Sequence, residues 1–240
     1  MGDLPIFVAH HSADVWARPD LYTLDEYFQP TVVAGCPPDA MAVDGQRWGN
    51  PLYRWDRMAS EDFAWWTARV QRALEQADVF RIDHFRGFAA YYEIPADSPD
   101  ATRGVWKTGP GKALFDAIAK SLGQLPIVAE DLGFITPDVH ELRDALAYPG
   151  MKILQFAFGD NQEERERFTP EKYTGANDDP AIMYVGTHDN NTALGWWYSE
   201  ARDRHRERLV PPARAWHDDP DYEIARLGPA APCARRDRCR

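Results

Sequence analysis

The sequence predicts an α/β protein, built as part of a TIM-type (β/α)8 barrel. Short apolar segments that suit buried strands alternate along the chain with helical patterns, and this alternation is typical of a parallel sheet. Three of the predicted strands are followed by acidic residues, namely Asp83, Glu130 and Asp189. Acidic side chains at the carboxyl ends of several strands are the pattern of a barrel active site. A doubly wound open sheet is the structural alternative, but no glycine-rich phosphate loop follows any of the predicted strands.

The first predicted strand covers residues 4–9, which are apolar on both faces, as in buried parallel strands. His10 and His11 follow it directly. Two interpretations of these histidines stay open, which are ordinary loop polarity and contact with a ligand.

Segment 31–55 is predicted to be a long loop without regular structure, because Pro37, Pro38 and repeated glycines interrupt it. Trp48 lies between such breakers and is hard to explain as a core residue alone. Long loops that carry aromatic and amide side chains commonly serve as lids or binding loops.

Helices and further strands follow in alternation. A helix is predicted to begin at Ser60, since a serine followed by acidic residues suits a helix N-terminus. Its apolar residues at helical spacing mark a buried face and are Phe63, Trp66, Val70 and Leu74. Two more helices are expected, one over residues 110–123 and one that begins with Thr136 as its N-cap. The remaining predicted strands cover residues 79–82, 126–129, 151–158 and 181–185.

Residues 1–200 are interpreted as a partial catalytic barrel, and residues 201–240 as an atypical tail, disordered or truncated, because no apolar periodicity continues there. The net charge of −11 argues against nucleic acid and anionic membrane surfaces as partners. Three cysteines without metal-type clustering indicate neither a disulfide framework nor a zinc site. The sequence has no apolar run of membrane-spanning length and no signal-peptide pattern, so we expect a cytoplasmic protein.

Arg81 and Asp83 are two apart on a predicted strand and therefore share a face. A guanidinium beside a carboxylate keeps that carboxylate ionised, as a glycosidase-type nucleophile must be. Glu130 follows an apolar strand, so we expect a raised pKa that suits a general acid. Asp189, with His188 beside it, suits the stabilisation of an oxocarbenium-like state. A magnesium site and plain strand-end capping are the alternatives for the three carboxylates. A metal is disfavoured because Arg81 would oppose it.

Five segments resemble the motifs of glycoside hydrolase family 77, the 4-alpha-glucanotransferases or amylomaltases of the alpha-amylase clan. They are GDLPIFVA at 2–9, GQRWGNP at 45–51, FRIDHFRG at 80–87, AEDLG at 129–133 and GTHDN at 186–190. The resemblance implies transfer of a 1,4-alpha-glucan segment to the 4-position of an acceptor glucan or glucose, without a cofactor or metal. The implied partners are alpha-1,4-glucans, such as maltodextrin and maltose, with glucose as an acceptor.

The resemblance also implies roles for individual residues. Asp83 would be the nucleophile, Glu130 the acid/base and Asp189 the transition-state stabiliser. The residues implied to bind substrate are Arg81 and His188 at the donor sugar, and Gln46 and Trp48 on a lid over the acceptor. We also expect Asp39 and His11 to contact substrate, although His11 stands where the family usually has Asp.

The family barrel has strands before residue 4 and a strand after residue 189 that this sequence lacks, so we expect a fragment that begins at about the third strand. Two alternatives to the transferase stay open. One is an incomplete, non-catalytic product, and the other is a retaining alpha-glucan hydrolase of the same clan, because transfer and hydrolysis share their catalytic residues.

Overall fold

The structure is a computed structural model that describes residues 1–39, 42–159, 168 and 180–201. The chain divides into two compact units, residues 1–150 and residues 151–240, and each is described by itself. The fold class is mixed α/β, as the sequence predicts. The predicted tail lies outside the described residues beyond Ala201.

A three-stranded sheet forms the base of the first unit. Its order is β1-β4-β7, with β1 at Gly2–Pro5, β4 at Phe80–Asp83 and β7 at Ile127–Ala129. Both pairings are parallel, so the carboxyl ends of the strands meet at one edge. The strands at 79–82 and 126–129 are thus found within about a residue of their predicted limits.

The predicted strand at residues 4–9 is wrong in its limits. The strand ends at Pro5, because Pro5 pairs with Asp83, which is the last residue of β4. Residues after Pro5 therefore have no residue of β4 opposite them to pair with. Residues 6–8 stay buried in the core although they are outside the strand, so their apolar character reflects packing and not sheet membership.

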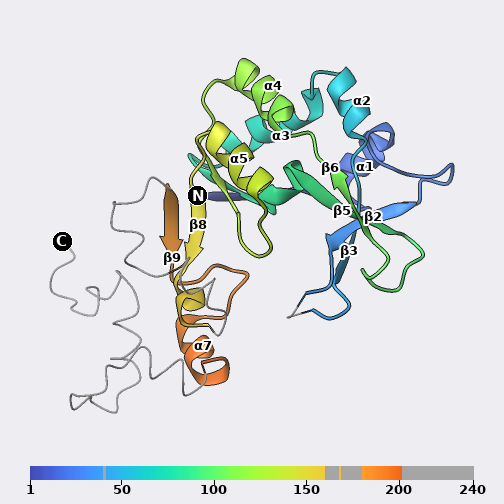
Figure 1. Cartoon of the computed structure of the whole chain (residues 1–240). Coiled ribbons are helices and arrows are strands. Elements are labelled where there is room, and N and C mark those ends of the chain that lie inside the picture. Colours follow the sequence, from blue (N-terminus) through green and yellow to red (C-terminus); the bar gives the residue numbers. More distant parts are fainter. Residues whose placement is uncertain (40–41, 160–167, 169–179, 202–240) are drawn as a thin grey trace, which may run out of the picture. The chain divides into compact units, whose positions relative to one another are not determined.

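Three helices of the first unit are α3 (Ala64–Leu74), α4 (Lys112–Leu122) and α5 (Pro137–Ala145). Helices α3 and α4 lie side by side (Figure 1). The predicted helix start at Ser60 is wrong, because Ser60 is the last residue of α2 (Trp55–Ser60). Asp62 and Phe63 then take left-handed backbone conformations, which break the helix before α3 begins.

A second, four-stranded antiparallel sheet has the order β3-β2-β5-β6. Its strands are β2 (Val32–Cys36), β3 (Gln46–Pro51), β5 (Ala90–Pro95) and β6 (Val105–Thr108). The prediction that 31–55 has no regular structure is therefore wrong. Gly35 does not break β2, because the two backbones meet closely there: a Cβ at Gly35 would lie 2.1 Å from the carbonyl oxygen of Gln46.

Shorter helical segments connect these elements in the first unit. They are α1 (Ala13–Ala17) and the 3-10 helices η1 (Pro19–Leu21) and η2 (Phe85–Phe88). The second unit contains a two-stranded sheet, a 3-10 helix and a helix, namely β8 (Gly150–Ile153), η3 (Leu154–Phe158), β9 (Ala181–Tyr184) and α7 (Ala193–Ser199). The predicted strand at 151–158 is therefore too long, since a 3-10 helix replaces its second half.

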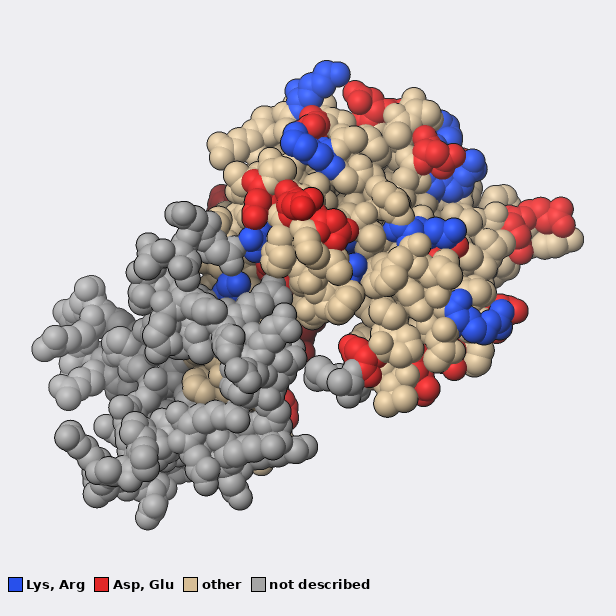
Figure 2. Space-filling model, viewed as in Figure 1, with Lys and Arg blue, Asp and Glu red and all other residues tan. Residues whose placement is uncertain are grey.

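Acidic and basic residues are interspersed on the described surface that faces the viewer in Figure 2, with neutral areas between them. Within the described part of the chain, no helix is long and apolar enough to cross a membrane.

Candidate active site

A buried arginine connects two carboxylates at the edge where β1 and β4 end. Arg81 Nε donates to Asp3 Oδ1 at 2.8 Å, and Arg81 Nη2 donates to Asp83 Oδ1 at 2.8 Å. The pairing follows from the strand register, which places Asp3 directly opposite Arg81, while Asp83 lies two residues further along the same face. The predicted Arg81–Asp83 ion pair is thus present in the structure.

Glu130 follows β7 and is held by main-chain N–H groups. The N–H of His84 donates to Glu130 Oε2 at 2.8 Å, and the N–H of Leu132 donates to Oε1 at 2.7 Å. His84 takes a left-handed backbone conformation, with φ 51° and ψ 49°, directly after Asp83. Both oxygens of the carboxyl group are therefore oriented by peptide groups whose positions depend on the strand ends.

Burial raises the pKa of Glu130 to about 7. The two N–H donors lower it, and the nearby charge of Asp83 raises it. A carboxyl group with this pKa is partly protonated near neutral pH, and it can both give and take a proton. The predicted upward shift of the Glu130 pKa is therefore found, with burial as its main cause.

Gln46 and Trp48 belong to strand β3 and not to a loop. The indole Nε1 of Trp48 donates to Gln46 Oε1 at 3.0 Å. The Trp48 ring also meets the His84 ring edge-on, with 4.8 Å between ring centroids. Trp48 thus contacts the residue that follows Asp83, and this contact connects the antiparallel sheet to the strand ends of the parallel sheet.

Asp39 and His11 also belong to the first unit. Asp39 follows β2, and its Oδ1 accepts the N–H of Ala42 at 2.7 Å. His11 lies near His10, with 4.7 Å between ring centroids, and both line a cavity together with Trp16.

Asp189 and His188 belong to the second unit, where His188 Nε2 lies 3.4 Å from Asp189 Oδ1. Thr187 Oγ1 accepts the N–H of Asp189 at 3.2 Å, and it donates to Asn190 Oδ1 at 3.0 Å. This short hydrogen-bonded turn after β9 carries both predicted residues.

Sequence reasoning missed Asp3, which shares Arg81 with Asp83. A parallel pairing of residues 2–5 with the central strand would have indicated it, but register is not visible in a single sequence. It also missed the N–H groups of His84 and Leu132, since a peptide group leaves no signal in residue identity.

Cys36 is the described cysteine, and burial raises the pKa of its thiol to about 12, so it is protonated at neutral pH. Within the described ranges there is no cluster of three or more His, Cys, Asp or Glu residues that could hold a metal ion. The described strand ends carry carboxyl groups, a guanidinium and an aromatic side chain.

Comparisons with known proteins extend this description. A family model described as 4-alpha-glucanotransferase matches residues 1–225. The 4-alpha-glucanotransferase of Thermus thermophilus is 53% identical over 197 residues, which cover 82% of this chain and 39% of that protein. The chloroplastic/amyloplastic 4-alpha-glucanotransferase of Solanum tuberosum is 49% identical over 197 residues, which cover 82% of this chain and 33% of the relative.

Among solved structures, the amylomaltase from Streptococcus agalactiae in complex with acarbose matches with a TM-score of 0.84 and 38% identity. That match covers 94% of this chain and 45% of the other. The chain thus spans about two fifths of the length of the curated relatives it matches.

Proposed function

The chain belongs to the 4-alpha-glucanotransferase family, and from that premise we propose that it supplies catalytic residues for transfer of a 1,4-alpha-glucan segment to the 4-position of an acceptor glucan or glucose. The observation that carries the proposal is the pair of acids at neighbouring strand ends. Asp83 is ion-paired with Arg81, while Glu130 has a pKa of about 7 and is fixed by two N–H groups. One acid is suited to attack and the other to proton transfer.

The proposed reaction is a retaining double displacement. A carboxylate oxygen of Asp83 attacks the anomeric carbon of the donor, and Glu130 gives its proton to the departing glycosidic oxygen. The acceptor 4-hydroxyl then attacks the same carbon, loses its proton to the Glu130 carboxylate and releases Asp83. Every proton and electron pair is accounted for without a cofactor or a metal.

The other predicted residues complete the proposal. Asp189 is assigned to stabilise the oxocarbenium-like state, and His188 and Arg81 to hold the donor sugar. The remaining substrate contacts are proposed for Gln46, Trp48, His11 and Asp39. The partners are alpha-1,4-glucans, with maltodextrin and maltose as donors and glucose among the acceptors.

For the fold, we propose that residues 1–200 form part of a (β/α)8 barrel of the alpha-amylase clan, and that residues 201–240 are a separate tail. The parallel order β1-β4-β7, with acids at its carboxyl edge, supports this assignment. The cytoplasmic location expected from the sequence stays a prediction.

Two alternatives to the transferase involve the same residues. In a retaining hydrolase, water would replace the acceptor hydroxyl. In a non-catalytic product, the residues would be present without turnover, and the short span relative to the family keeps this alternative open. Measurement of both glucose release and chain transfer separates the three.

The test replaces Asp83 with Asn and Glu130 with Gln in a full-length enzyme that contains this chain. Disproportionation of maltotriose should fall by at least about 10²–10⁴-fold in each variant, because each loses one chemical role. A fluorinated donor should label Asp83, and the two carboxyl groups should lie about 5–5.5 Å apart in a ligand complex. The control is Asp116→Asn, an exposed acid on α4, which should keep full activity. Label on another residue would overturn the assignment.

A further inference from the structure

A cavity of about 710 Å³ opens in the first unit beyond the first strand. Its lining is His10, His11, Ser12, Ala13, Val15, Trp16, Pro19, Phe28 and Gln29. Neither Asp83 nor Glu130 is in this set. The size is that of a site for a small molecule or for a short segment of a polymer.

Two large aromatic side chains in this lining are exposed to solvent. Trp16 is 86% exposed and Phe28 is 60% exposed. Phe28 also has a left-handed backbone, with φ 60°, which is unfavourable for a bulky residue. The strain is not compensated by burial of the Phe28 ring, so a role other than core packing accounts for this side chain better.

The walls of the cavity are fixed by hydrogen bonds. Asp25 Oδ1 accepts the N–H groups of Tyr27 and Gln29, both at 2.8 Å, and this holds the turn that carries Phe28. His10 Nε2 then donates to the carbonyl oxygen of Phe28 at 2.8 Å. The turn is thereby joined to the segment that follows β1, and the backbone position of Phe28 is fixed before any ligand arrives.

The chemistry of the lining selects a class of ligand. Among the described residues that form it, none is Lys, Arg, Asp or Glu. Phosphates and carboxylates would find no Lys or Arg here, and His10 and His11 do not belong to a group of three or more His, Cys, Asp or Glu among the described residues that could hold a metal ion. Aromatic faces beside imidazole, hydroxyl and amide groups suit a neutral molecule that has an apolar face and many hydroxyls, which is a sugar.

We propose that this cavity is a second glucan-binding subsite, in which Trp16 and Phe28 stack on glucose rings and His11 and Gln29 bond their hydroxyls, so that the substrate contact proposed for His11 belongs to this subsite. The choice of an alpha-1,4-glucan as the sugar rests on the proposed function, whereas the sugar class rests on the lining. The subsite holds a part of a long chain away from the reacting bond, so it increases affinity for long glucans more than for maltose.

The first experiment measures binding of maltoheptaose and maltose to the whole chain by calorimetry. Trp16→Ala and Phe28→Ala should each weaken maltoheptaose binding by about 10-fold, the loss expected for one stacked ring. The matched control is Tyr27→Ala, since Tyr27 is 74% exposed in the same turn but outside the lining. Equal affinities in all three variants would overturn the proposal, as would tighter binding of inorganic phosphate than of glucan.

A second variant separates binding from folding. Asn tolerates a left-handed backbone, so Phe28→Asn should raise the melting temperature by roughly 2–4 °C while it weakens maltoheptaose binding. A merely structural Phe28 would give a lower melting temperature, and that result would contradict the proposal.

A third comparison separates this subsite from the catalytic proposal. Asp83→Asn should leave the loss of affinity caused by Trp16→Ala unchanged, because the two residues lie in different sites. If Asp83→Asn keeps its turnover of maltotriose while this loss persists, the proposed reaction is wrong and the subsite stands. If turnover depends on Asp83 but Trp16→Ala binds maltoheptaose normally, the subsite is wrong.

Discussion

Glu130 and Asp131 are consecutive acids after the same strand, yet their surroundings differ completely. Glu130 is held by the N–H groups of His84 and Leu132 and has a pKa near 7. Asp131 is 0% exposed and pairs with the buried Arg143 of α5, whose Nη1 donates to Oδ2 at 2.7 Å. Glu130 therefore faces the strand-end edge, where His84 lies, whereas Asp131 faces helix α5, which carries Arg143.

The difference shows what decides whether a buried acid serves in a structural ion pair or in proton transfer. Arg143 holds Asp131 in a buried ion pair, and this ion pair connects the end of β7 to α5. Peptide dipoles orient Glu130 but offset its burial only in part, so it keeps an exchangeable proton. Only the second environment suits proton transfer at neutral pH, although both residues are acids in one short motif.

The largest loss of stability is expected when the buried ion pair between Asp131 and Arg143 is removed. Asp131→Asn should destabilise the first unit by about 3–5 kcal/mol, because it leaves Arg143 buried without its opposite charge. Chemical denaturation measures this difference. The neighbouring Asp144, whose side chain is 59% exposed and also contacts Arg143, is the control. Asp144→Asn should cost less than about 1 kcal/mol, and equal losses in the two variants would contradict the comparison.

Glu130→Gln should instead change how stability depends on pH. The pKa of Glu130 rises from 4.5 to about 7 on folding, so the folded state loses stability as the pH rises through that interval. This loss is on the order of 3 kcal/mol in the wild type and absent in the glutamine variant. The free energy of unfolding, measured at pH 4 and pH 8, should therefore fall with rising pH in the wild type and stay constant in the variant. The amide NH2 introduced by Glu130→Gln faces an N–H donor at both pH values, and this cost is the same at each, so it cancels in the comparison. An unchanged pH dependence would mean that Glu130 is not desolvated.

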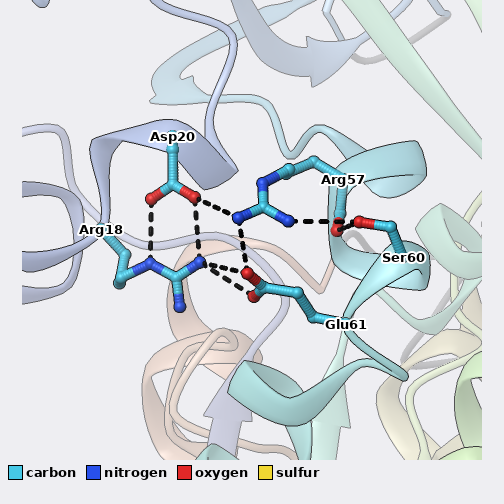
Figure 3. Close-up of polar contacts among 5 residues, drawn as sticks. All are labelled: Arg18, Asp20, Arg57, Ser60 and Glu61. Atoms are coloured by element: carbon cyan, nitrogen blue, oxygen red, sulfur yellow. Dashed lines mark hydrogen bonds and ion pairs between the residues drawn. The ribbon is translucent and has the colours of Figure 1, made fainter.

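The smallest effect belongs to a cluster of charges at the surface. Between η1 and α2, Arg18 and Arg57 both contact Asp20 and Glu61 (Figure 3). The pKa of Asp20 is lowered to about 2, mainly by its hydrogen bond from Arg18. Arg57→Ala should still cost less than about 1 kcal/mol, because these side chains are partly exposed and screened by salt. Denaturation at low and high ionic strength tests this, and a cost as large as that of Asp131→Asn would show that burial is not the deciding factor.

The sequence predicted the buried parallel strands well, because β4 and β7 are continuous apolar runs that end in polar residues. It therefore placed Asp83 and Glu130 correctly at strand ends. The antiparallel sheet was missed because Gly35 looks like a breaker, although it serves a close approach of two strands. The role of Asp3 was missed because it depends on which strand lies beside β1, and that is a property of pairing and not of local sequence.

The two main-chain hydrogen bonds to Glu130 determine which kinds of mutation can disturb its carboxyl group. Its two donors are peptide N–H groups, so no ordinary side-chain substitution deletes either one, although the left-handed backbone at position 84 disfavours β-branched residues there. Proline is the exception, because it lacks the N–H. Changes in the length of these segments would also remove the hydrogen bonds, since one inserted or deleted residue would point the two N–H groups away from Glu130. In a scan of variants, this part of the site should therefore tolerate many substitutions and few insertions or deletions, which is the opposite of a site built from polar side chains.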